Sequence, residues 1–228
     1  MKRREFIYLT GCDGTGKTTQ VQLLQKEMQA KAVKTRQVWL RFPFFFSALL
    51  LVYARLRGYS RQEVVDGTRH GYWDFRHSWL MKHAFPYVML LDAALAAGWM
   101  IYLPLWRGET VLCERFVLDM LVDLGVAYGE PHFYARWPGS LYLRLLPAGA
   151  RLFILDLDLE SLRLRRADLH GDRKLRERLE AFRILAEGLH LHTISSAPPA
   201  IEVNRQIMAA LAQPIFLDSQ TGENLLDL

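Results

Sequence analysis

The chain has 228 residues, a hydrophobic content of 51% and a formal net charge of +5, which suit one α/β domain with an ample core. No internal repeat, low-complexity tract or long basic run is present, so we expect no nucleic-acid partner. Two cysteines, Cys12 and Cys113, do not make a disulfide framework, and we therefore expect a reducing, cytoplasmic compartment.

Strand and helix patterns alternate along the chain. Strand patterns cover residues 5–10, 36–40, 110–113, 151–157 and 191–195. Helical patterns cover residues 17–31, 84–106, 116–128, 159–189 and 200–212. This alternation predicts a parallel five-stranded sheet with helices on both faces. Ligands of such sheets bind beyond the carboxyl ends of the strands.

The segment between the first strand and the first helix, residues 11–19, reads Gly-Cys-Asp-Gly-Thr-Gly-Lys-Thr-Thr. It completes the P-loop pattern of Gly, four residues and Gly-Lys-Ser/Thr. Glycines let backbone N–H groups face phosphate oxygens, Lys17 supplies a positive charge, and the Thr18 hydroxyl suits Mg²⁺. We therefore predict ATP and Mg²⁺ as ligands. The predicted nucleotide-binding residues are Gly11, Asp13, Gly14, Thr15, Gly16, Lys17, Thr18 and Thr19.

Two apolar stretches follow. Residues 42–54 are too short to span a bilayer. Residues 84–106 are long enough, but they include Pro86, Gly98 and Pro104, and Asp92 lies well inside, where a charge is costly in lipid. We interpret the second stretch as a buried core helix and expect no stable membrane insertion. The alternative is a helix that docks on a membrane or on an apolar substrate.

Charged residues follow the second and third predicted strands. Arg41 projects at the end of the second strand, because Pro43 keeps its neighbour extended. Glu114 and Arg115 follow the third strand, where a carboxylate and an arginine can organise Mg²⁺ and hold an acceptor phosphate. The alternative for both places is an ordinary solvated ion pair.

Residues 159–178 form an arginine-rich segment, which His170, Gly171 and Asp172 divide into two arms. Two basic arms about a flexible turn suit a lid that closes over a triphosphate and stabilises the phosphoryl group in transfer. The alternative is the charged, solvent-exposed face of a helix. The arginines of this segment are Arg163, Arg165, Arg166, Arg173, Arg176 and Arg178.

In their order and spacing these motifs resemble those of the thymidylate kinase family, over most of residues 4–212. The matching elements are the 11–19 loop, Arg41-Phe42-Pro43, Glu114-Arg115-Phe116, the 155–158 strand end with the arginine-rich segment, and the 195–212 turn and helix. The resemblance implies a three-layer P-loop NTPase fold with an arginine-rich lid, contact of Asp13 with the acceptor sugar, and a homodimer. It also implies that the catalytic arginine comes from the lid, as Arg165, Arg166 or Arg173, because Gly14 stands where some members carry an arginine.

The helix before the third strand departs from the family pattern. Members usually carry an aromatic residue and an arginine there, and this chain has Asp92 and Ala96. An aspartate cannot stack on a base and would repel a phosphate. We therefore expect a remodelled acceptor site, in which Arg76 or Lys82 replaces the missing charge. The predicted acceptor-binding residues are Asp13, Arg41, Pro43, Arg76, Asp92 and Arg115.

We expect an ATP-dependent kinase that transfers the γ-phosphoryl group to a small-molecule acceptor, a nucleoside monophosphate such as dTMP. Lys17 and Arg115 complete the predicted catalytic set, with Thr18 and Glu114 at the metal. Residues 1–213 make one kinase domain, with an insertion at 44–83, a lid at 159–178 and a tail at 214–228. The alternatives are a kinase of an uncharged or apolar acceptor, which Asp92 favours, a non-enzymatic ATP-binding module, and a nucleic-acid-binding ATPase.

Overall fold

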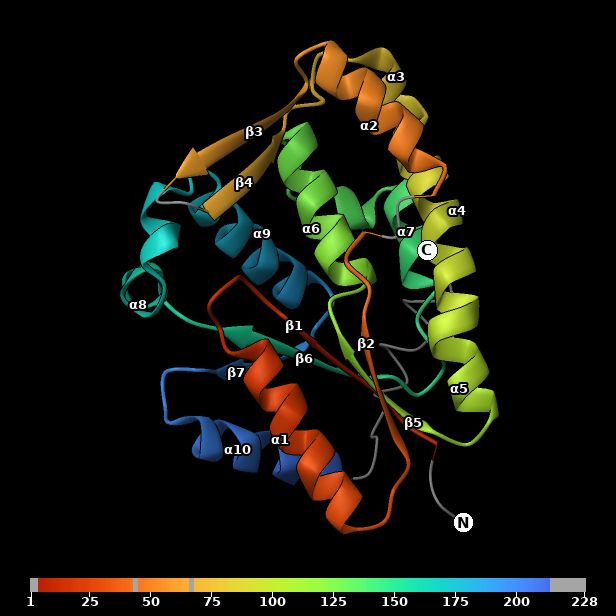
Figure 1. Ribbon diagram of the computed structural model, residues 1–228, viewed down its shortest axis with the longest axis vertical. Helices are drawn as coiled ribbons and strands as arrows, with labels where there is room; N and C mark the ends of the chain where they lie inside the picture. The colour runs from red at the N-terminus through yellow and green to blue at the C-terminus, as the bar shows by residue number, and fades with distance from the viewer. Residues whose placement is uncertain (1–3, 43–44, 66–67, 214–228) are drawn as a thin grey trace.

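The computed structural model describes residues 4–42, 45–65 and 68–213 (Figure 1). Pro43 and the tail at 214–228 lie outside these residues. At the centre is a parallel sheet with the strand order β2-β5-β1-β6-β7. The strands are β1 (Phe6–Thr10), β2 (Thr35–Trp39), β5 (Thr110–Glu114), β6 (Arg151–Asp156) and β7 (His192–Ser195). The predicted five-stranded parallel sheet is confirmed, and each strand boundary lies within one residue or so of its expected place.

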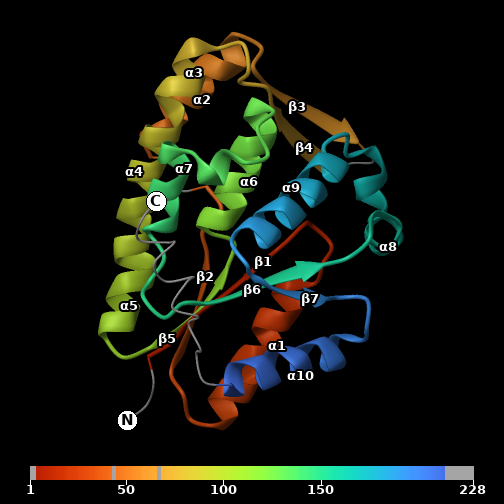
Figure 2. The ribbon, with the colours of Figure 1, turned by 180° about the vertical axis from the view of Figure 1, so that it is seen from behind.

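Helices cover both faces of the sheet, as the alternation predicts (Figure 2). Successive residues of β1 point to opposite faces, so Ile7 and Leu9 join one hydrophobic cluster while Phe6 and Tyr8 join the other. On the first face lie α1 (Lys17–Ala30) and α10 (Ala200–Ala212). On the other face lie α4 (Phe85–Ala97), α6 (Val117–Tyr128), α7 (Trp137–Leu143) and α9 (Leu175–Gly188).

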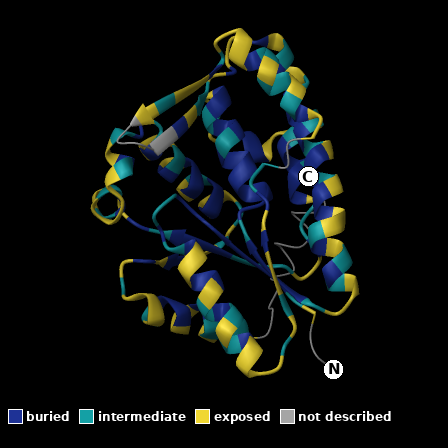
Figure 3. Ribbon diagram, in the orientation of Figure 1, coloured by how far each residue is buried: buried dark blue, intermediate teal, exposed yellow. Residues whose placement is uncertain are grey.

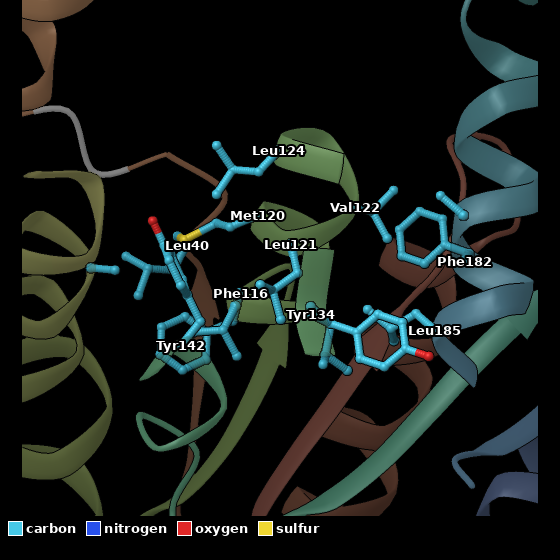
Figure 4. Close-up of a cluster of buried hydrophobic side chains, with 14 of the residues drawn as sticks. Leu40, Phe116, Met120, Leu121, Val122, Leu124, Tyr134, Tyr142, Phe182 and Leu185 are labelled. Atoms are coloured by element: carbon cyan, nitrogen blue, oxygen red, sulfur yellow. The ribbon is translucent and has the colours of Figure 1, made fainter. Parts of the chain in front are cut away.

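The larger hydrophobic cluster is centred on α6. Its side chains, such as Met120 and Leu121, lie between Tyr142 of α7 and Phe182 of α9 (Figure 4). The helix is apolar on nearly every side, which suits its position between the sheet, α7 and α9. Because α6 is buried along its length, the residues of its first turn are held in place next to the carboxyl ends of the strands.

The 44–83 insertion holds elements that the sequence patterns did not predict. They are α2 (Ser47–Leu56), an antiparallel hairpin of β3 (Ser60–Val65) and β4 (Thr68–Trp73), and α3 (Trp79–His83). Figure 1 shows the hairpin at the opposite end of the molecule from α1 and α10. The insertion therefore lies beyond the carboxyl ends of the strands, on the side away from α1 and α10.

The apolar stretch 84–106 is helical throughout, as α4, a π-helical turn (Gly98–Tyr102) and α5 (Leu103–Trp106). The wider turn accommodates Pro104, whose ring cannot fit a regular helix interior. Within the described residues, Phe85–Trp106 is the one helix long and apolar enough to cross a membrane, judged by length and composition alone.

Burial of this helix differs from the expectation of a core helix. Its inner face is buried, including Met89 and Ala93, but Leu95, Trp99 and Trp106 are exposed (Figure 3). A single long helix at the edge of the fold packs against α2 and α7 on one side only. The prediction is therefore right for one face and wrong for the other.

The predicted helix over 159–189 is divided in the structure. It consists of α8 (Leu159–Arg165), a 3₁₀ turn (Ala167–Gly171) and α9. A second 3₁₀ turn, Phe133–Ala135, precedes α7. The interruption falls where Gly171 and Asp172 were expected to break the helical pattern, so α8 and the 3₁₀ turn stand apart from the sheet beside the carboxyl end of β6.

Candidate functional site

The loop from Gly11 to Gly16 connects β1 to α1 and depends on its glycines. Gly11, Gly14 and Gly16 have φ values of 135°, 89° and 83°, which only glycine adopts without strain. A Cβ at Gly11 would also stand 2.3 Å from the carbonyl oxygen of Leu155 on β6. Close packing against the neighbouring strand and the left-handed backbone therefore both require glycine here.

Lys17, the first residue of α1, directs its side chain back into this loop. Its Nζ donates to the carbonyl oxygens of Gly11 at 2.8 Å and Cys12 at 2.6 Å. Burial lowers the pKa of Lys17 below its ordinary value. The loop is braced further by the Thr15 hydroxyl, which donates to the Cys12 carbonyl at 2.9 Å. The cation is thus held at a defined place by backbone oxygens instead of a carboxylate.

Thr18 and Glu114 meet across the gap between α1 and β5. The Thr18 hydroxyl donates to Glu114 Oε1 at 2.8 Å. A hydroxyl and a carboxylate oxygen are ligands that Mg²⁺ accepts, with water and phosphate completing its shell. No group of three or more His, Cys, Asp or Glu side chains able to hold a metal occurs in the described part of the chain. The oxygen pair fits a metal that a phosphate chain helps to hold.

Arg115 follows β5 and is fixed between two carboxylates. Its guanidinium donates to Asp13 of the glycine loop and, at 3.2 Å, to Asp119 of α6. Its φ of 67° is a strained backbone conformation for a residue other than glycine. Because Asp119 is 1% exposed, the pair lies largely out of water.

Asp119 is a buried residue of the candidate site that the sequence patterns missed. It accepts hydrogen bonds from the hydroxyls of Tyr8 at 2.7 Å and Thr10 at 2.8 Å. Burial raises the pKa of Tyr8 well above its usual range, so the phenol stays a donor. The available signal was the spacing of four residues between Arg115 and an acidic residue.

Arg41, at the carboxyl end of β2, forms a two-bond pair with Asp123. The Arg41 Nε and Nη2 donate to the two Asp123 oxygens at 3.0 and 3.1 Å. The guanidinium also lies 3.7 Å from Asp13. Asp13 is therefore shared by Arg41 and Arg115, and the loop, β2 and α6 are joined through charged groups.

Two cavities open at the carboxyl ends of the strands. The first, here called the loop cavity, has a volume of about 890 Å³ and is lined by the residues 13–20, by Glu114 and by the β7–α10 turn from Ser196 to Ala200. The second, here called the hairpin cavity, has a volume of about 400 Å³ and lies between α2, the β3–β4 hairpin and α6. Asp13, Arg41 and Arg166 line both cavities, which therefore meet at these residues.

The three arginines predicted to belong to a lid lie in different places relative to the two cavities. Arg165 lines the loop cavity and donates to the Ser196 carbonyl at 2.7 Å. Arg166 lines both cavities and pairs with Asp168, with Nε 3.0 Å from a carboxylate oxygen. Arg173 is 77% exposed, lies 3.6 Å from Glu63 of the hairpin, and lines neither cavity.

Asp92 does not line either cavity, contrary to the expected role in acceptor binding. It is fully buried and accepts the backbone N–H groups of Phe45, Phe46 and Ser47 at 2.9–3.1 Å, together with the Ser47 hydroxyl at 2.5 Å. These are N–H groups at the start of α2, which need an acceptor. The carboxylate therefore fixes α2 in place.

The two residues expected to replace the missing charge also lie outside both cavities. Arg76 pairs with Asp74 at 2.9 Å and lines a separate hollow on the outer side of the hairpin. Lys82 lies 3.2 Å from Glu130 and lines neither cavity. The charges that do line the hairpin cavity are Arg41, Arg55, Arg166, Lys174 and Arg178, with Asp13, Asp123, Asp168 and Asp172.

No family model matches the chain, and the search of curated proteins found no match.

Removal of the Asp92 carboxylate should destabilise the fold. In Asp92→Ala three N–H groups and one hydroxyl lose their acceptor, and we expect a loss of about 3 kcal/mol in the free energy of unfolding. Urea denaturation measures it. Asp158→Ala is the matched control, because Asp158 accepts the Ser161 N–H at the exposed start of α8, where water can replace the carboxylate. An equal loss in both variants would contradict this role of Asp92.

Cys12 should be unreactive in the native protein although it lies in the glycine loop. Burial raises the pKa of its thiol to about 12, so at pH 8 only about one thiol in ten thousand is the nucleophilic thiolate. Cys113 is fully buried as well. We expect neither cysteine to react with iodoacetamide at pH 8 within an hour, and both to react in urea. Rapid labelling of the native chain, read by mass spectrometry, would contradict this.

Proposed function

We propose that this protein is an ATP-dependent phosphotransferase of the thymidylate kinase type, which transfers the γ-phosphoryl group of ATP to a nucleoside monophosphate such as dTMP. The observation that carries the proposal is the meeting of the two cavities at Asp13, Arg41 and Arg166. A donor in the loop cavity and an acceptor in the hairpin cavity would be brought together beside two arginines, and proximity of this kind is a large part of phosphoryl-transfer catalysis.

The loop cavity suits a triphosphate. The glycine loop leads into the N-terminus of α1, where free N–H groups and the helix dipole favour an anion. Lys17 adds a buried positive charge beside the loop. In this proposal the loop is a P-loop, the three-layer fold is that of a P-loop NTPase, and the adenine lies near the turn from Ser196 to Ala200.

In the proposed mechanism the Thr18 hydroxyl and the Glu114 carboxylate would hold Mg²⁺, which would neutralise negative charge on the phosphates. Lys17 binds the β- and γ-phosphates. Arg115 lines the loop cavity and is held by Asp13 and Asp119, so it would orient the acceptor phosphate where the two cavities meet at Asp13. These groups position and stabilise charge, and none has to form a covalent bond.

The arginine-rich segment acts as a lid in this proposal. Of the three candidate lid arginines, Arg165 and Arg166 line the loop cavity, and Arg166 also lies where the two cavities meet. Among the residues that the structure describes, the Arg166 guanidinium pairs with Asp168, which belongs to the same segment, so Arg166 can turn toward the γ-phosphoryl group as the segment closes. Arg173 would need a larger movement, because it faces solvent beside Glu63.

A phosphorylated acceptor is favoured over an uncharged one. The argument for an uncharged acceptor was repulsion by Asp92, and Asp92 lies outside the hairpin cavity. Five cationic side chains line this cavity against four carboxylates. The charge balance therefore suits an anionic acceptor.

Lys17→Ala should abolish turnover while the fold remains intact. We expect ADP production from ATP–Mg²⁺ and dTMP to fall by about a hundredfold or more, because one charge aimed at the transferred phosphate is lost. Lys26→Ala, an exposed site on the same helix, is the matched control. Circular dichroism checks the fold of both variants.

The same assay separates the competing functions. ADP production that depends on dTMP and vanishes only in Lys17→Ala supports the kinase. Binding of ATP without transfer to any nucleotide would contradict it and favour a non-enzymatic ATP-binding module. Turnover that needs DNA or RNA in place of a nucleotide would favour a nucleic-acid-dependent ATPase.

A further inference from the structure

His70 is a buried polar residue of the hairpin cavity with an unpaired nitrogen. It lies on β4, opposite Glu63 of β3, and is 9% exposed. Its Nε2 has no hydrogen-bond partner in the part of the chain that the structure describes. Its ring stacks beside that of Tyr72, with centroids 6.4 Å apart. Buried polar atoms are nearly always paired, so the unpaired Nε2 of a residue that lines the cavity is available to a ligand once the ring turns toward it.

Arg55 of α2 is an exposed cation in the same wall. Arg41, Arg166 and Arg178 of this cavity each pair with an aspartate, namely Asp123, Asp168 and Asp172. Arg55 makes no ion pair with any described residue, although it too lines the cavity. Its position follows from the Asp92 contacts that fix the start of α2.

An aromatic surface adjoins these two donors. Phe42 and Trp73 both line the cavity, with ring centroids 5.0 Å apart, and Trp73 stacks on the buried Phe75 at 5.4 Å. Flat apolar walls with a few polar groups are typical of sites for planar rings. The cavity therefore offers a surface for a ring and donors for the polar atoms at its edge.

The two ends of the hairpin cavity differ. One end is the border with the loop cavity at Asp13, Arg41 and Arg166. The hairpin that carries His70 belongs to the other end of the molecule from α1 and α10 (Figures 1 and 2). An acceptor with its phosphate at the border would thus direct its ring toward the hairpin.

We propose that His70 is a specificity-determining residue that binds the base of the acceptor. The proposal rests on the proposed phosphotransfer. With the ring turned about its Cβ–Cγ bond, Nε2–H donates to a carbonyl oxygen of the base, and Arg55, which has donors only, binds a second one. Two donors match a pyrimidine with two carbonyl groups, such as thymine or uracil. The amino group of cytosine or adenine would bring a donor against a donor.

The test compares dTMP, dUMP, dCMP and AMP as acceptors for the wild type, His70→Ala and His70→Gln. We expect the wild type to prefer the dione bases, and His70→Ala to raise KM for dTMP about tenfold with kcat and the KM for ATP little changed. His70→Gln should restore part of the loss, since its amide can donate. His77→Ala is the matched control, because His77 is exposed on the outer side of the hairpin.

Two outcomes would overturn the proposal: preference of the wild type for dCMP or AMP, or unchanged acceptor preference in His70→Ala. If the wild type phosphorylates none of the four nucleotides, the proposed function fails, and calorimetric titration with dTMP then decides the role of His70 alone. Binding that is lost in His70→Ala and kept in His77→Ala supports the contact. Equal binding by both variants, or none by the wild type, contradicts it.

Discussion

The buried Asp119 carboxylate is the group on which the site depends. It takes hydrogen bonds from Tyr8 and Thr10 of β1 and an ion pair from Arg115, and Arg115 in turn holds Asp13 of the glycine loop. A buried charge is stable only when its lone pairs are satisfied, so these partners are obligatory. One carboxylate thus couples β1, the loop, the end of β5 and α6, and it holds Arg115 in a backbone conformation that would otherwise relax.

A second carboxylate, Asp92, organises the other half of the site from outside it. By binding the first N–H groups of α2 it sets the helix that carries Arg55, and α2 and the adjoining hairpin form the outer wall of the hairpin cavity. Asp92 is therefore compatible with a phosphorylated acceptor, because its carboxylate accepts the backbone N–H groups at the start of α2 and lies outside the hairpin cavity. The two carboxylates fix the strand ends on one side of the site and α2 on the other, and Arg166 of the arginine-rich segment lines both cavities.

The sheet and its loop could be predicted from the sequence because their signals are local. Strand patterns, the glycine spacing and the polar residues after each strand all lie within short windows, and their order implies a common edge. The roles of Asp119 and Asp92 could not be predicted, because their partners are distant: Tyr8 is 111 residues from Asp119, and Ser47 is 45 residues from Asp92. The hairpin was missed for a related reason, since His70 and Trp73 acquire their neighbours only when the insertion folds over α6.

The most direct test of the account is a crystal structure with a bisubstrate analogue in which adenosine and thymidine are joined through a phosphate chain. The account predicts the phosphates over the loop from Gly14 to Lys17, the adenosine half near Ser196, and the thymine against His70. Phosphates that avoid the loop, or a thymidine half outside the hairpin cavity, would contradict it.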